Sequence, residues 1–231
     1  MISVQNIIKE YNGTRVLHID GLEIKRGESV GLVGNNGAGK TTLFSMILDL
    51  IQASSGEISI NGLKVQGNEQ WKAFTGSFLD ESFLIGYLTP EEYFYFIGSL
   101  HNLSEQDVDA FVNEYTEFFN GEILGKKKYI RDLSKGNQKK VGIVGALIGH
   151  PELIILDEPF ANLDPSSQFR LKNLIRDLIA SRQVTILISS HDLSHTVEIS
   201  NRIIALEKGQ IIKDIITSPE TLEELTAFFS V

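Results

Sequence analysis

The stretch Val30-Gly31-Leu32-Val33-Gly34-Asn35-Asn36-Gly37-Ala38-Gly39-Lys40-Thr41-Thr42-Leu43 decides the fold of this chain. An apolar, β-branched segment leads through a glycine-rich turn into a helical pattern, which is the strand–turn–helix context of a P-loop. Glycines let successive backbone N–H groups point inward, and the helix N-terminus adds the positive end of its dipole. The motif Gly-x-x-x-x-Gly-Lys-Thr is complete from Gly34 to Thr41, so the sequence predicts a site for a nucleoside triphosphate.

Two side chains of this loop carry its chemistry. Lys40 is expected to reach the β- and γ-phosphates, and the Thr41 hydroxyl is expected to bind Mg²⁺. The other positions predicted to contact the nucleotide are Gly34, Asn35, Asn36, Gly37, Ala38, Gly39 and Thr42.

The bulk composition limits the classes of protein. The 231 residues are 42% hydrophobic and 22% charged, which is typical of a soluble globular domain. The chain has no cysteine, which excludes disulfides, thiol catalysis and cysteine-based zinc sites. A net charge of −9 disfavours nucleic acid as a partner. Neither a signal peptide nor a membrane span is visible, so we expect a cytosolic protein whose membrane role depends on a partner.

The hydrophobic pattern predicts an α/β fold: a P-loop NTPase core with a mostly parallel sheet, an N-terminal antiparallel β subdomain and an inserted α-helical subdomain. Asn61-Gly62 marks a hairpin turn, and Thr89 and Ser104 precede two predicted helices, the second running to Phe119. A third predicted helix spans residues 134–150. We expect one domain over residues 1–231, divided into a core (1–80 and 151–217), a helical subdomain (81–150) and a short C-terminal helix (218–231).

The apolar segment Leu153–Leu156 ends in two carboxylates, Asp157 and Glu158. Alone, such a pair is as easily explained as the cap of a turn. Combined with a P-loop, Asp157 is expected to hold Mg²⁺ and Glu158 to polarise an attacking water.

The segment Leu133-Ser134-Lys135-Gly136-Asn137-Gln138 reads as a helix N-terminus with a hydroxyl and a glycine, which is an anion-binding arrangement. In isolation it would be a good N-cap and nothing more. Placed between the P-loop and the acidic strand, it resembles the signature motif of the ATP-binding cassette (ABC) family.

The resemblance covers essentially the whole chain and implies ATP as the nucleotide. Tyr11 resembles the aromatic residue that stacks on adenine, and Asn162-Leu163-Asp164 the segment that crosses between subunits. His191 resembles the switch histidine that contacts the γ-phosphate. The implied catalytic residues are Lys40, Glu158 and His191, and Ser134 and Gly136 are expected to bind the nucleotide of a second subunit.

Two positions depart from the common family pattern. Lys135 and Asn137 replace a glycine and a glutamine of the signature motif. Asp80 occupies the place of a glutamine beside Mg²⁺ and is therefore a candidate metal residue, with Glu81 as the alternative equivalent. These variants are similar to the branch that serves drug, peptide-antibiotic and polysaccharide exporters.

The leading hypothesis is therefore the ATPase subunit of an exporter, attached to the inner face of the membrane through transmembrane permease subunits. A dimer, of identical or different ATPase subunits, is implied by the resemblance. The alternatives are a soluble ABC ATPase acting on nucleic acid or ribosomes, a non-hydrolysing regulator, and an importer subunit. The aromatic run Tyr93–Phe96 is mainly predicted core, and part of it is a candidate docking groove for the membrane partner.

Overall fold

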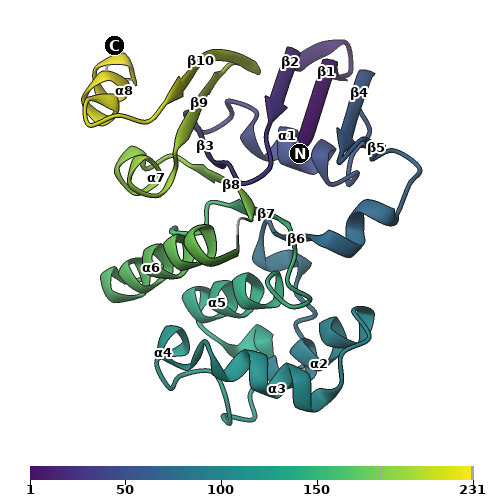
Figure 1. The fold of residues 1–231 in the computed structure, drawn as a ribbon, viewed down its shortest axis with the longest axis vertical. Helices are drawn as coiled ribbons and strands as arrows, with labels where there is room; N and C mark the ends of the chain where they lie inside the picture. The colour runs from purple at the N-terminus through teal and green to yellow at the C-terminus, as the bar shows by residue number, and fades with distance from the viewer. Residues whose placement is uncertain (183, 230–231) are drawn as a thin grey trace.

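The computed structural model describes residues 1–182 and 184–229, so the last two residues of the predicted C-terminal helix lie outside the described residues. Two β-sheets occupy one end of the molecule and the helices α2 to α5 occupy the other (Figure 1). Among the described residues, no helix combines the length and the apolar character that crossing a bilayer requires.

The first sheet is antiparallel and has the strand order β2-β1-β4-β5. Its strands are β1 (Ile2–Tyr11), β2 (Thr14–Ile24), β4 (Ser55–Ile60) and β5 (Leu63–Lys64). Ile60 pairs with Leu63 across Asn61 and Gly62, whose φ angles are 50° and 75°. Positive φ at both turn residues is what a two-residue hairpin requires, so the predicted turn is confirmed.

The second sheet has the order β10-β9-β3-β8-β7-β6, parallel except for the β9–β10 hairpin. Its strands are β3 (Ser29–Val33), β6 (Thr75–Phe78), β7 (Leu153–Asp157), β8 (Thr185–Ser190), β9 (Arg202–Glu207) and β10 (Gln210–Ile216). Every residue of β3, β7 and β8 is buried, as expected for strands covered on both faces. The mostly parallel core sheet is thereby confirmed.

Strand β6 was not predicted from the sequence. Its residues Thr-Gly-Ser-Phe lack an apolar run, and the strand lies at the edge of the sheet, paired with β7 alone. A Cβ at Gly76 would lie 1.8 Å from the Ala146 carbonyl oxygen, so the position requires a residue without a side chain.

Four helices pack with the core: α1 (Lys40–Ile47), α6 (Pro165–Arg182), α7 (Leu193–Ile199) and α8 (Thr221–Phe229). The inserted helices are α2 (Pro90–Leu100), α3 (Glu105–Asn113), α4 (Thr116–Phe119) and α5 (Lys135–Gly145). Thr89 caps α2 and Ser104 caps α3, which confirms the predicted starts of both helices; each cap is a reciprocal capping box.

Two helix boundaries differ from the prediction. The single helix expected over 104–119 is divided into α3 and α4, and the Thr116 hydroxyl donates to the Asn113 carbonyl at the break. A hydroxyl that takes a main-chain carbonyl competes with the helical ladder. The helix expected over 134–150 ends at Gly145 and continues only as turns.

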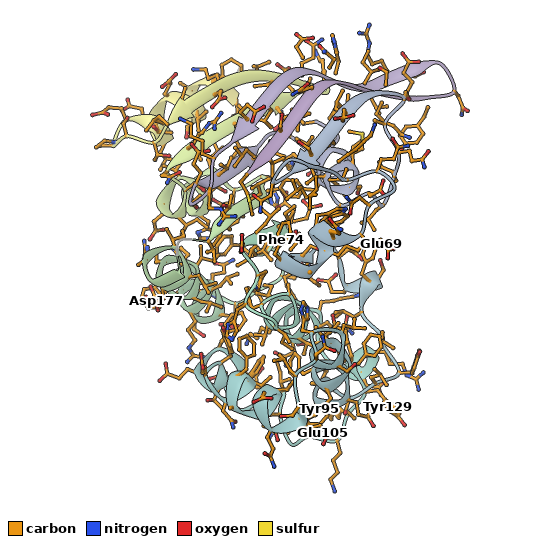
Figure 2. The ribbon with its side chains drawn as sticks, turned by 45° about the vertical axis from the view of Figure 1, so that its right-hand side comes forward. Glu69, Phe74, Tyr95, Glu105, Tyr129 and Asp177 are labelled. Atoms are coloured by element: carbon orange, nitrogen blue, oxygen red, sulfur yellow. The ribbon has the colours of Figure 1, made fainter. Side chains whose placement is uncertain are left out.

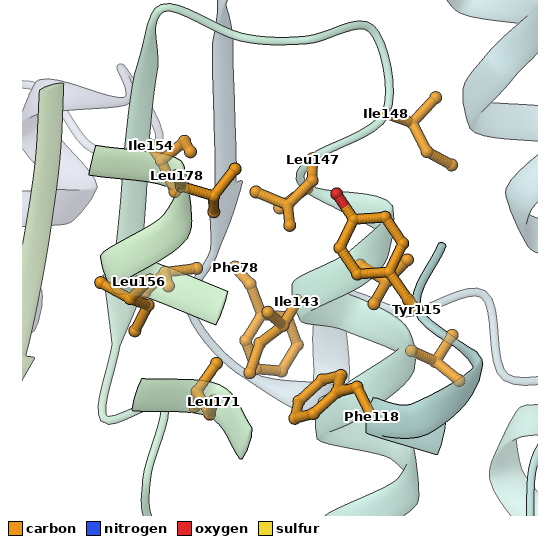
Figure 3. Packing of buried hydrophobic residues seen from close by; sticks show 14 of the residues in the cluster. Phe78, Tyr115, Phe118, Ile143, Leu147, Ile148, Ile154, Leu156, Leu171 and Leu178 are labelled. Atoms are coloured by element: carbon orange, nitrogen blue, oxygen red, sulfur yellow. The ribbon is translucent and has the colours of Figure 1, made fainter. Parts of the chain in front are cut away.

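One apolar cluster joins the inserted helices to the core sheet. Phe78 of β6, Phe118 of α4, Ile143 of α5 and Leu171 of α6 belong to it and lie close together in Figure 3. This packing places α5 beside β6 and β7, next to the candidate site residues Asp157 and Glu158.

Candidate nucleotide-binding site

The glycine-rich loop connects β3 to α1 in a conformation that only glycine adopts readily. Gly34 and Gly39 have φ angles of 155° and 108°. A Cβ at Gly34 would lie 2.3 Å from the Leu206 carbonyl oxygen, so a side chain there is excluded by β9 as well as by the backbone angle. The loop is therefore held against the sheet, with α1 beginning at Lys40.

Lys40 lies between this loop and the acidic end of β7. Its side chain is 7% exposed, and its Nζ donates to the Gly34 carbonyl at 2.7 Å and to the Asn35 carbonyl at 3.4 Å. The Glu158 Oε1 atom lies 3.6 Å from the same Nζ. The ammonium is thus presented at the mouth of the loop, where the phosphates of a nucleotide would need a counter-charge.

Thr41 and Asp157 meet as a pair of oxygen groups from α1 and β7. Thr41 Oγ1 donates to Asp157 Oδ2 at 2.5 Å, and the Ser189 hydroxyl donates to the other carboxylate oxygen. Burial raises the pKa of Asp157, although the hydrogen bonds from Ser189 and Thr41 oppose that shift.

These two groups fit Mg²⁺. That ion prefers oxygen, keeps several waters, and uses one or two protein carboxylates together with substrate phosphates. Among the described residues there is no group of three or more His, Cys, Asp or Glu side chains that could hold a metal. A Thr–Asp pair beside a phosphate loop is therefore the kind of incomplete ligand set that Mg²⁺ with a nucleotide completes.

Glu158 and His191 are brought together at the ends of β7 and β8. Glu158 Oε2 lies 2.8 Å from His191 Nδ1 and accepts the His191 backbone N–H at 3.3 Å. The Glu158 backbone has a φ of 47°, unusual for a residue other than glycine, and its N–H donates to the carbonyl of Ser189 at 3.2 Å and to its hydroxyl at 3.0 Å.

A cleft contains most of the predicted nucleotide-binding positions. It is lined by Tyr11, Val16, Asn36, Gly37, Ala38, Gly39, Lys40, Thr41, Thr42 and Glu158. Tyr11 is 49% exposed, and the Lys9 ammonium lies 4.7 Å from its ring centroid. The phenol is therefore available to a ligand in the same cleft that Lys40 lines.

A second cleft shares Thr41 and Glu158 with the first and contains Asp80, Glu81, Lys139 and Asp157. Asp80 is exposed, and its carboxylate accepts the Ser82 N–H at 2.7 Å; its hydrogen bonds with Ser82 lower its pKa. Glu81 is the more buried neighbour, with its side chain 13% exposed. Asp80 and Glu81, the two candidates for the position of the family glutamine, thus line the same cleft, but Asp80 is exposed and Glu81 is largely buried.

Ser134 and Gly136 do not line the nucleotide cleft of their own chain, as far as the described residues extend. Ser134 caps α5 by accepting the Asn137 N–H at 3.2 Å and is otherwise exposed. A Cβ at Gly136 would lie 2.9 Å from the Asn162 carbonyl oxygen, so the signature motif packs against the loop that follows Glu158.

The profile of the family described as ABC transporter matches residues 17–161, which is more than half of the chain. The chain belongs to the ABC transporter family. The match begins before the P-loop and ends just beyond Glu158, so it includes the phosphate loop, the signature motif and the acidic strand.

Curated relatives agree with this assignment. The uncharacterized ABC transporter ATP-binding protein sll0415 of Synechocystis is 33% identical over 83% of this chain and 54% of its own length. The corresponding protein R00382 of Rhizobium meliloti is 32% identical over 94% of this chain and 82% of its own length. The chain thus spans about half the length of the first relative and most of the second.

The fold agrees as well. A solved structure described as the ATP-binding subunit of an ABC transporter superposes with a TM-score of 0.85 at 28% identity, covering 100% of this chain and 95% of that one. The predicted fold class of this ABC domain is therefore confirmed.

Three residues that line the site of this ABC domain or contact it were not predicted as site residues: Val16, Ser189 and Lys139. Ser189 follows an apolar strand in the same way as Asp157 does, and the two residues are register partners of the parallel β7–β8 pair. Lys139 is a cation in a helix whose neighbouring positions are buried. Both placements depend on the fold, on the β7–β8 register and on the burial of α5, and neither residue belongs to a named motif.

Proposed function

We propose that this chain binds ATP with Mg²⁺ and hydrolyses it as the ATPase subunit of an ABC transporter. One observation carries the proposal: Lys40, the Thr41–Asp157 pair and the Glu158–His191 pair converge on connected clefts. A cation, a hard-metal ligand pair and a carboxylate with an oriented imidazole are the groups that phosphoryl transfer to water requires.

Each residue has a distinct role in this proposal. Lys40 and the backbone N–H groups of the loop bind the phosphates, and Tyr11 stacks on the base. Glu158 accepts a proton from the water whose oxygen attacks the γ-phosphorus, while the bond to the leaving ADP oxygen breaks in line. His191, beside Glu158, orients that carboxylate and reaches toward the γ-phosphate. Bound Mg²⁺ would neutralise charge on the β- and γ-phosphate oxygens, held by Thr41 and Asp157, with Asp80 at the rim.

The site of one chain is incomplete in this proposal. Ser134 and Gly136 lie at the exposed N-terminus of α5, which is suited to an anion, yet they do not line the cleft of their own chain. A head-to-tail dimer, of this chain or with a related ATPase chain, supplies each P-loop with the signature motif of the other and encloses two ATP molecules.

A groove between the core and the inserted helices is the proposed docking site for a transmembrane partner. It is lined mainly by apolar residues, among them Leu50 and Phe83, which are 49% and 60% exposed. Of the aromatic run Tyr93–Phe96, only Tyr93 lines this groove. Tyr95 instead donates to Asp109 at 2.7 Å, at the far end of the helical region (Figure 2).

We assign the partner as a permease of the export type, with the ATPase on the inner face of the membrane. The variant residues Asp80 and Lys135, which are similar to those of the drug, peptide-antibiotic and polysaccharide exporter branch, support that direction. The net charge of −9 supports a protein partner over nucleic acid.

The substitution Glu158→Gln tests the hydrolytic role. Because an amide cannot accept the proton of water, we expect kcat to fall by about 10²- to 10⁴-fold while ATP still binds and dimers accumulate. Steady-state phosphate release and light scattering with ATP measure the two effects. Glu105→Gln is the matched control, since Glu105 is exposed on α3 at the far end of the molecule. A normal rate in Glu158→Gln would remove Glu158 from the mechanism.

A further inference from the structure

Lys139 is a buried cation that faces the catalytic loop from the signature helix. It lies on α5, five residues after Ser134, and is 4% exposed. Its Nζ donates to the Glu158 carbonyl oxygen at 2.8 Å and lies 3.6 Å from Glu81 Oε1. A buried ammonium is costly unless it is paired and hydrogen-bonded, so the partners of Lys139 define where it can lie.

The Glu158 backbone needs support of this kind. Its φ of 47° is a left-handed conformation that a side chain disfavours. On one side, the Glu158 N–H is held by the hydroxyl and the carbonyl of Ser189. On the other side, the Glu158 C=O accepts from Lys139. These contacts hold both the N–H and the C=O of Glu158 in place. The backbone that they fix sets the direction in which the Glu158 carboxylate points, toward His191.

Glu81 supplies the counter-charge of Lys139. It follows β6 at the point where the predicted helical subdomain begins, and its side chain is 13% exposed. Its Oε1 atom is buried and has no hydrogen-bond partner among the residues that the structure describes, so the Lys139 ammonium is its electrostatic partner. One cation therefore joins three segments: the loop after β6, the helix α5 and the loop after β7.

We propose that Lys139 is a positioning residue for Glu158, and that Glu81 holds Lys139 in place. The rate of ATP hydrolysis then depends on how α5 and the loop after β6 sit against the end of β7. This inference rests on the proposed role of Glu158 and adds a residue that acts through it. Lys139 touches no reacting atom; it fixes the backbone that carries the base.

The substitution Lys139→Met removes the ammonium and keeps most of the aliphatic stem. We expect kcat to fall by about 10- to 100-fold, since small displacements of a catalytic group cost rates of that order. The KM for ATP and the affinity for a fluorescent ATP analogue should change less than about twofold, because the phosphate loop is untouched. Lys139→Arg keeps the charge and the donors, and the adjoining cleft gives the longer side chain room, so it should recover most of the lost rate.

A double variant separates positioning from stability. Lys139→Met leaves the Glu81 carboxylate buried without its cation, which lowers the melting temperature. Adding Glu81→Gln removes that charge, so Lys139→Met/Glu81→Gln should regain melting temperature while kcat stays low. Lys172→Met is the matched control: Lys172 pairs with Glu198 at 2.6 Å between α6 and α7, away from both clefts, and its loss should leave kcat unchanged.

Two results would overturn the inference. One is a kcat within about twofold of the wild type in Lys139→Met. The other is recovery of kcat together with stability in the double variant, which would make the pair a structural one. If Glu158→Gln hydrolyses ATP normally, the proposed function fails instead; if Glu158→Gln is slow and Lys139→Met is fast, the inference alone fails.

Discussion

At the scale of single residues, Asp157 is a buried acid whose ionised form destabilises the fold. The residue is 4% exposed, and burial raises the pKa of its carboxyl group. The folded chain therefore binds a proton at Asp157 more tightly than the unfolded chain does. Stability from this group is complete below the unfolded pKa and is lost as pH rises through the folded pKa, so at neutral pH the ionised carboxylate destabilises the fold.

Asp157→Asn should accordingly make the chain more stable at neutral pH. The amide oxygen can accept from Ser189 and the amide nitrogen can donate to Thr41, so both contacts survive. Each unit by which the pKa is raised corresponds to about 1.4 kcal/mol of stability regained at pH 7. The difference in melting temperature between variant and wild type, measured without nucleotide, should be positive at pH 7.5 and shrink toward pH 4.

The same substitution should weaken the additional stabilisation that ATP with Mg²⁺ gives, because an amide is a poorer ligand for a hard cation. Thr75→Ala is a control for loss of a polar contact, because its hydroxyl donates to the Trp71 carbonyl and the residue lines neither of the two clefts that contain Thr41 and Glu158. If the melting temperature of Asp157→Asn at pH 7.5 were equal to or below that of the wild type, the buried, ionised Asp157 carboxylate would not be destabilising the fold.

The sequence predicts the residues that lie in contiguous motifs better than those brought in by the fold. Lys40, Thr41, Asp157 and Glu158 follow from residue type and spacing, and the structure gathers them in connected clefts. Ser189 and Lys139 could not be found in this way, because their contacts depend on the β7–β8 register and on the packing of α5. The roles assigned to these residues stay predictions until they are tested.

At the scale of elements, segments with a strong hydrophobic pattern of their own were predictable. Elements that form only because a neighbouring element pairs with them were not. The capped helices α2 and α3 and the buried strands β7 and β8 follow from their own residues. The edge strand β6 forms because β7 offers it a partner, which its own sequence does not reveal. The division into a core and a helical subdomain at residues 80/81 and 150/151 stays a prediction.

Gly142 is where α5 meets β6, and its replacement by alanine tests that packing. Helix propensity alone predicts that Gly142→Ala stabilises α5 by about 1 kcal/mol. A Cβ there, however, would lie 2.1 Å from Cε2 of Phe78, whose ring is 3% exposed and confined by the cluster in Figure 3. Overpacking of a core costs about 1–3 kcal/mol, so steric strain should win.

We therefore expect Gly142→Ala to lower the melting temperature by several degrees, since about 1 kcal/mol corresponds to roughly 2–4 °C in a chain of this size. Thermal unfolding followed by circular dichroism measures it. Gly21→Ala is the control, because a Cβ at Gly21 meets nothing within 4 Å. An unchanged or higher melting temperature in Gly142→Ala would mean that α5 moves freely relative to β6.

At the scale of the whole molecule, the P-loop and the signature motif of one chain lie apart from each other. The P-loop, Asp157 and Glu158 lie at the ends of the core strands, whereas Ser134 lies at the exposed start of α5 outside the nucleotide cleft. A chain that hydrolysed ATP alone would leave the signature motif unused. In the proposed head-to-tail pair both halves are used twice, and each complete site would contain one P-loop and the signature motif of the other chain.

That arrangement predicts complementation between two inactive variants. Lys40→Ala removes the ammonium proposed to bind phosphate, and Ser134→Arg places a bulky side chain at the start of α5; each should be inactive as a homodimer. In a mixed dimer both defects fall in one site, and the other site keeps an intact P-loop and an intact signature motif. An equimolar mixture should recover up to about a quarter of the wild-type phosphate release, if half of the dimers are mixed and one of their two sites works.

Phosphate release from the mixture is compared with the sum of the two separate variants, and light scattering with ATP confirms that dimers form. A mixture of Lys40→Ala with Glu158→Gln is the matched control, because both defects then lie on the P-loop side and each mixed dimer has no intact site. Recovery in the first mixture and none in the second requires that a site be shared between chains. Equal, purely additive rates in both mixtures, with dimers present, would mean that Ser134 serves its own chain, and the head-to-tail arrangement would have to be abandoned.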